Sequence, residues 1–117
     1  MNLDRALREM MERCPGCRAA AIVDPDGIPV VVEPDAAEVE TLGAELAALI
    51  RDIGEAGREL DHGQVLQFTV AAERARIVLT TMAAGYFLVM VLGPDGIVGR
   101  AQFVSRLTGE RLHSEFI

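Results

Sequence analysis

The chain has 117 residues, of which half are hydrophobic and a quarter are charged, and its formal net charge is −7 at pH 7. This length suits one domain spanning residues 1–117, with a core large enough to fold without disulfides or metals. All of its basic residues are arginine. The acidic balance argues against binding to nucleic acid or anionic membranes, and the lack of lysine excludes Schiff-base chemistry.

The N-terminal segment alternates charged and apolar residues, unlike a secretory signal, so we expect a cytoplasmic protein. One uncharged run, residues 77–93, approaches the length of a membrane span. It falls short of the roughly 20 apolar residues that a spanning helix needs. We interpret it as a hairpin of two buried strands, and we expect no insertion into a membrane.

Hydrophobic periodicity predicts a helix, two strands, a long helix, three strands and a final helix, in that order. A helix from residue 3 ends before Pro15-Gly16, and the strands at 17–23 and 28–33 flank an Asp-Pro-Asp-Gly turn. Pro29 cannot donate to a sheet ladder, which places the second strand at a sheet edge. Tight turns between adjacent strands predict an antiparallel α+β sheet with helices on its faces.

The long helix begins at a capping box formed by Asp35 and Glu38 and carries a continuous apolar stripe from Val39 to Leu60. A second stripe of small residues runs beside it. Each of its glycines costs about 1 kcal/mol relative to alanine, which indicates close approach of another backbone. This stripe consists of Gly43, Ala47, Ile50, Gly54 and Gly57, and the outer face carries Glu38, Glu45 and Asp52.

The second half of the chain predicts strands at 65–70 and 76–83 and a further strand at 86–92. The last of these is apolar throughout and is therefore expected at the centre of the sheet. A final helix follows from residue 97, and Gly109 is expected to interrupt it.

Cys14 and Cys17 are the only cysteines in the chain. A reactive cysteine pair usually sits at a helix N-terminus, whereas Cys14 closes a helix and Cys17 opens a strand. A zinc site would need two more ligands, and the two histidines, His62 and His113, are not clustered in sequence. We interpret the pair as two small buried apolar residues, with redox sensing as the alternative. No pattern in the sequence predicts catalytic, cofactor-binding or metal-binding residues.

The stretch CPGCRAAAIVDPDGIPV resembles the opening of the Roadblock/dynein light chain family, and the later QVLQFTV…RIVLTTMAAGYFLVMVLGPDGIVGRA follows the same family's order. Within this family, the chain resembles the bacterial MglB-like branch. The resemblance implies a five-stranded antiparallel sheet with one helix on one face and two on the other, a Roadblock/profilin-like α/β/α sandwich. It also implies a homodimer without catalytic residues of its own.

In such dimers the third strands join edge to edge and the long helices pack together. The resemblance thus places Val65, Gln67, Thr69 and the small-residue stripe in the interface, and Glu38, Glu45 and Asp52 on a face open to a partner. It implies regulation of a cytosolic small Ras-like GTPase, including stimulated hydrolysis as in the MglB type. The alternatives are a redox- or ligand-sensing module using Cys14 and Cys17, or a pure scaffold. The residues themselves favour self-association, because the strand at 65–70 has no proline or charge to protect an open edge.

Overall fold

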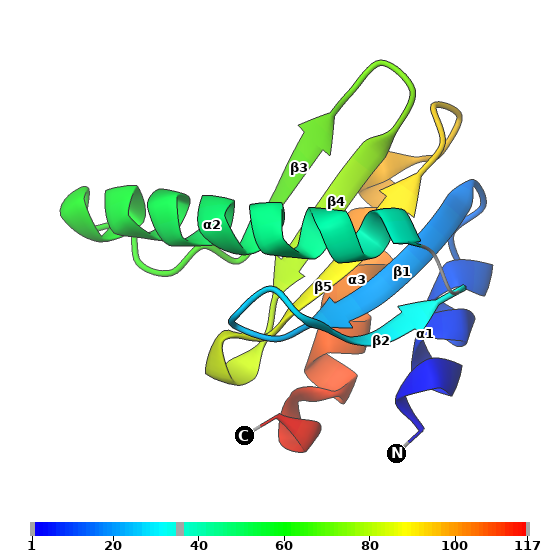
Figure 1. The fold of residues 1–117 in the computed structure, drawn as a ribbon, viewed down its shortest axis with the longest axis horizontal. Coiled ribbons are helices and arrows are strands. Elements are labelled where there is room, and N and C mark those ends of the chain that lie inside the picture. The colour runs from blue at the N-terminus through cyan, green and yellow to red at the C-terminus, as the bar shows by residue number, and fades with distance from the viewer. Residues whose placement is uncertain (1, 35–36, 117) are drawn as a thin grey trace.

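The computed structural model describes residues 2–34 and 37–116, and within them the chain forms three α-helices and one antiparallel five-stranded sheet (Figure 1). The element order is the one that the sequence predicts. Two short 3₁₀ turns, η1 and η2, follow β4 and α3. The bounds are α1 Leu3–Glu12, β1 Cys17–Val23, β2 Pro29–Glu33, α2 Ala37–Glu59, β3 Gln67–Ala71, β4 Arg76–Thr81, η1 Ala83–Gly85, β5 Phe87–Leu92, α3 Val98–Arg111 and η2 His113–Glu115.

The strands lie in the order β2-β1-β5-β4-β3. Strand β5 pairs with both β1 and β4 and is buried along its whole length, which confirms the predicted central strand. The uncharged run at 77–93 folds as the hairpin of β4 and β5. Pro29 begins β2, which is an edge strand as expected. The other edge strand is β3, whose only partner within the described residues is β4.

Helix α2 covers one face of the sheet, and α1 and α3 cover the other (Figure 1). Alternation along β1 divides the core accordingly: Ala20 and Ile22 pack toward α1 and α3, whereas Ala19, Ala21 and Val23 pack toward α2. The predicted arrangement of one helix against two is therefore confirmed.

Two local expectations need correction. Strand β3 begins at Gln67 and not at Val65, although the backbone N–H of Thr81 still donates to the Leu66 carbonyl. Helix α3 continues through Gly109 to Arg111, because its buried positions on both sides of this glycine keep it packed on the sheet. The capping box predicted at Asp35 lies outside the described residues.

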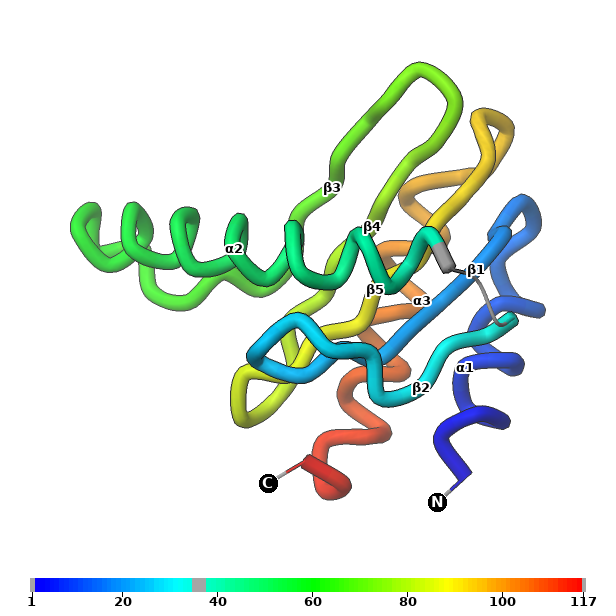
Figure 2. The backbone as a smooth tube through the Cα atoms, viewed as in Figure 1, coloured from blue at the N-terminus to red at the C-terminus, as the bar shows by residue number. Residues whose placement is uncertain are grey.

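Only the first half of α2 packs on the sheet, and its second half extends beyond it (Figure 2). Val39, Leu46 and Ala47 are buried, whereas Leu49, Ile53 and Leu60 are 43%, 38% and 65% exposed. The apolar stripe that the sequence predicts is present, but its second half is only partly covered by the described residues. Within residues 2–34 and 37–116, no helix is both long and apolar enough to cross a membrane.

Candidate interaction surfaces

Two features that proteins seldom leave exposed lie close together in this fold. The outer edge of β3 carries backbone groups without a strand partner in the described chain, and the uncovered half of α2 carries exposed leucine and isoleucine side chains. Figures 1 and 2 show α2 passing near the start of β3, its second half extending past the sheet, and the loop at residues 60–66 leading back to β3. Leu66, directly before β3, is 72% exposed. An open strand edge beside uncovered apolar surface is typical of an association surface.

The small-residue stripe of α2 divides between the interior and this surface. Gly43 is buried against the β1–β2 turn: a Cβ on Gly43 would lie 2.6 Å from the carbonyl oxygen of Gly27. Ala47 is 4% exposed in the core. The close backbone approach that the sequence indicates at Gly43 is thus made within the chain, which corrects the expectation that Gly43 and Ala47 face a second copy.

Further along the stripe, Ile50, Gly54 and Gly57 are partly exposed. Among the described residues, a Cβ on Gly54 would meet only the Arg58 guanidinium, at 3.7 Å, so none of them requires glycine there. At Gly57 the nearest atom would be the Gly63 carbonyl oxygen, at 3.0 Å. Contacts within the described chain therefore explain glycine at positions 43 and 57 but not at position 54.

Two of the expected interface residues, Gln67 and Thr69 of β3, have side chains engaged on the α3 side of the sheet. Gln67 Nε2 donates to Thr80 Oγ1 and to the Gln102 carbonyl, and Thr69 Oγ1 accepts from Gln102 Nε2. Val65 is half-buried and its carbonyl accepts from Thr81 Oγ1. What β3 offers to a partner is therefore its backbone edge, with these side chains held in place behind it.

The acidic face of α2 is open to solvent. Glu38, Glu45 and Asp52 are all exposed, and among the described residues none of them forms an ion pair. Spacings of seven residues place them on one side of the helix. Their charges are consequently available to a basic partner.

The cysteine pair lacks the features of a reactive site. Burial raises the pKa of Cys14, with a smaller opposing effect from the Arg100 guanidinium. Burial and then the neighbouring Cys14 raise the pKa of Cys17 to about 11, against a smaller lowering effect of a backbone hydrogen bond at Ala19. Both thiols are free, and in the part of the chain that the structure describes no group of three His, Cys, Asp or Glu side chains could hold a metal.

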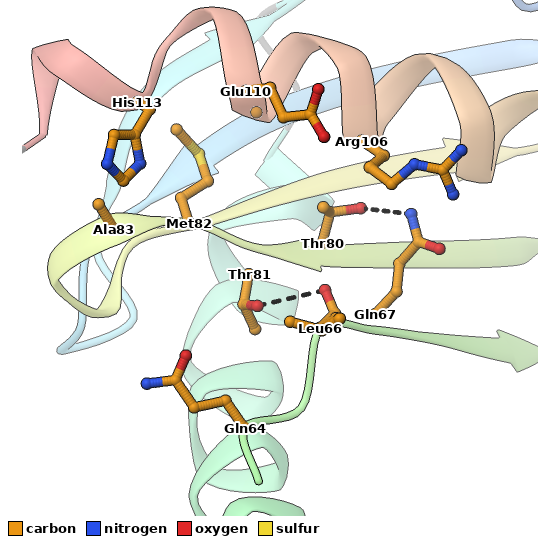
Figure 3. A pocket seen from close by; sticks show the side chains of 11 residues that line it. Gln64, Leu66, Gln67, Thr80, Thr81, Met82, Ala83, Arg106, Glu110 and His113 are labelled. Carbon is orange, nitrogen blue, oxygen red and sulfur yellow. Dashed lines mark hydrogen bonds between the residues drawn. The ribbon is translucent and has the colours of Figure 1, made fainter.

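A cleft that the sequence did not predict opens between α3 and the start of β3 (Figure 3). It has a volume of about 450 Å³. Thr80 and Gln67 lie on its floor, Met82 and Ala83 form an apolar end, and Arg106, Glu110 and His113 lie along the helix side. Its lining comes from three separate segments, so hydrophobic periodicity could not reveal it. The glycine inside α3, Gly109, is the local sequence feature that indicates a possible cleft.

A family model and several solved structures are similar to this chain. The model of the Roadblock/LC7 domain matches residues 3–105. A Roadblock/LC7 domain from Streptomyces avermitilis is similar with TM-score 0.88 at 18% identity, over 98% of both chains. The gliding protein MglB from Thermus thermophilus gives TM-score 0.83 at 18% identity, over 95% of this chain and 87% of that one. MglC from Myxococcus xanthus gives TM-score 0.68 at 27% identity, over 98% of this chain and 99% of that one. Among curated proteins, none matches the sequence.

Proposed function

Because the chain belongs to the Roadblock/LC7 domain family, we propose that it is a non-catalytic adaptor that forms a homodimer and regulates a small Ras-like GTPase. The observation that carries this proposal is the open edge of β3 beside the uncovered half of α2. The similarity to MglB and MglC supports a regulatory partner of this class.

Two-fold pairing explains the exposed features together. Joining β3 to the same strand of a second copy satisfies the open backbone edge on both chains and yields one continuous sheet. The uncovered halves of the two α2 helices then lie on the same side of that sheet, where Leu49 and Ile53 can bury against their counterparts. Gly54 allows these helices to approach closely, since it presents no side chain.

The GTPase is proposed to dock on the α2 side of the dimer, where Glu38, Glu45 and Asp52 are exposed. Unpaired carboxylates on a rigid helix raise the association rate with a basic surface more than they raise affinity. Stimulation of GTP hydrolysis is proposed to occur by repositioning groups of the GTPase itself when it docks on the dimer.

Sedimentation velocity at micromolar concentration tests the dimer, and the variant Gly54→Arg tests its geometry. The wild type is expected to sediment as a dimer and Gly54→Arg as a folded monomer with unchanged circular dichroism. A well-folded wild-type monomer would overturn the homodimer.

The regulatory step is tested with a small Ras-like GTPase from the same organism, loaded with GDP or with a non-hydrolysable GTP analogue. Binding that depends on the nucleotide, together with a changed hydrolysis rate, supports regulation. Binding that is equal for the two nucleotide states indicates that the protein is a scaffold and not a regulator.

A further inference from the structure

We propose that the cleft between α3 and the start of β3 is a docking site for an extended segment of a partner protein that carries an apolar side chain beside a carboxylate. The cleft lies mainly between α3 and the sheet, on the opposite face from most of α2, and Leu66 lines the part of it that reaches the edge of the sheet (Figures 1 and 3). It is thus separate from the face proposed to bind the GTPase, and the inference requires neither the GTPase nor the dimer.

Gly109 is the first observation. It lies inside α3 in an ordinary helical conformation, where glycine is destabilising relative to alanine. A Cβ there would be 3.9 Å from Leu88 Cδ1 and from Met82 Cγ, which is normal packing distance. The fold therefore has no steric need for glycine at this position, and what the missing side chain provides is open space in the cleft.

The floor of the cleft is a second observation. Gln67 Nε2 faces the Gln102 carbonyl, which can only accept, so this contact fixes the orientation of the amide. Nε2 also donates to Thr80 Oγ1, which in turn contacts Ser105 Oγ at 2.9 Å. No donor in the described part of the chain reaches Gln67 Oε1. A rigidly held and unused carbonyl oxygen matches a peptide N–H.

The charges along α3 give the segment its polarity. Arg106 extends above Gln67, and none of the described carboxylates pairs with it. Glu110, one helical turn further on, repels a second carboxylate from the other end. An acidic side chain is therefore placed at the Arg106 end, since a guanidinium matches a carboxylate in both charge and geometry.

The opposite end of the cleft is apolar. Met82 and Ala83 line it next to the bare backbone of Gly109, and His113 borders it (Figure 3). An apolar side chain fits between these residues, beside the acidic one. The cleft is open to solvent, which suits a chain segment passing through it better than a small molecule that needs to be enclosed.

The test uses the full-length protein labelled with ¹⁵N and the blocked tetrapeptide glycine-leucine-aspartate-glycine as the probe, in both orders of its central pair. We expect saturable shifts of the Gly109 amide and the Gln67 side-chain amide for one order, with a dissociation constant on the order of 1 mM. Replacing aspartate by asparagine, or leucine by alanine, in the peptide should weaken binding about fivefold or more.

Two variants and a control locate the site. Arg106→Gln should weaken the peptide about fivefold or more, whereas Arg58→Gln, on α2, should leave it unchanged. Gly109→Ala should raise Tm by a few degrees and yet weaken the peptide, because the added methyl group enters the cleft.

Several results would overturn the proposal. One is an asparagine peptide that binds as well as the aspartate peptide, and another is a lack of saturable shifts at about tenfold higher concentration. A third is unchanged binding in Arg106→Gln. If Arg106→Gln instead weakens self-association in sedimentation, the occupant is a second copy of this chain and the proposal is wrong.

Discussion

Gly43 of α2 lies in contact with Gly27 of the β1–β2 turn, so closely that a Cβ on Gly43 would come within 2.6 Å of the Gly27 carbonyl oxygen. Gly27 itself has a φ of +88°, which disfavours any side chain there. The two glycines let the turn pack directly on the helix and fix where α2 crosses the sheet.

We therefore predict that Gly43→Ala destabilises the fold. The added methyl group meets backbone atoms that cannot rotate away, and overpacking of this kind costs about 1–3 kcal/mol. Urea denaturation at one fixed protein concentration measures the change. Gly99→Ala is the control, because a Cβ at Gly99 has nothing within 4 Å, and it should leave stability equal or slightly higher. Equal midpoints for Gly43→Ala and wild type would contradict the contact.

A second prediction concerns the hydroxyl groups buried beneath α3. Ser105 Oγ donates to the Ala101 carbonyl at 2.7 Å, so the hydroxyl of Thr80 donates to Ser105 and accepts from Gln67 Nε2. Ser105→Ala removes the acceptor of a hydroxyl whose residue is 5% exposed. Leaving such a group unsatisfied costs about 1–3 kcal/mol in the free energy of unfolding.

The double variant Thr80→Val with Ser105→Ala distinguishes this explanation from simple loss of packing. It removes both hydroxyls, so it should be less destabilised than the sum of the two single variants. Additive losses would mean that the two hydroxyls do not act as a pair.

The sequence predicted the elements and their order because each carries a local signal: the 3–4 spacing of α2, the unbroken apolar run of β5 and the proline of β2. It could not say which glycines of α2 meet another part of the same chain, since Gly43 and Gly27 belong to different elements that meet only in the folded chain. It likewise could not show that the apolar stripe of α2 extends beyond the sheet. That result depends on how the length of the helix compares with the width of the sheet, which is known only from the folded chain.

The cleft illustrates the same limit. The sequence predicts that Gly109 interrupts α3, and the structure shows a continuous helix that borders a cleft at this glycine. A glycine inside an amphipathic helix signals either a break or a cavity, and the sequence alone does not separate the two.

The thiols give a prediction with a defined pH range. The pKa of Cys17 is raised to about 11 from 9.0 by burial and by Cys14, so the folded state holds the thiol proton more tightly than the unfolded state does. The stabilisation from the protonated thiol is present below pH 9.0 and is lost as the pH rises toward about 11. Wild type should therefore lose more stability than Cys17→Ala over that interval, as followed by urea denaturation.

Alkylation by iodoacetamide checks the same property at neutral pH. With the pKa of Cys17 near 11, its thiolate fraction at neutral pH is about 100-fold smaller than that of an unperturbed cysteine. Modification of the folded protein should be correspondingly slow by mass spectrometry. A rate equal to that of free cysteine would restore the redox interpretation of the pair.

The last prediction concerns the acidic face of α2. Reversing Glu38, Glu45 and Asp52 to arginine should slow association with the GTPase about tenfold at low salt, because steering by exposed charges acts mainly on the association rate. The effect should fade as salt shortens the Debye length, and the dimer should persist in sedimentation. The matched control reverses three other exposed acids that form no ion pair within the described chain and lie away from α2, namely Glu12, Glu73 and Asp95. Stopped-flow measurements that show the same slowing for both triple variants would assign the effect to net charge alone and remove α2 as the docking face.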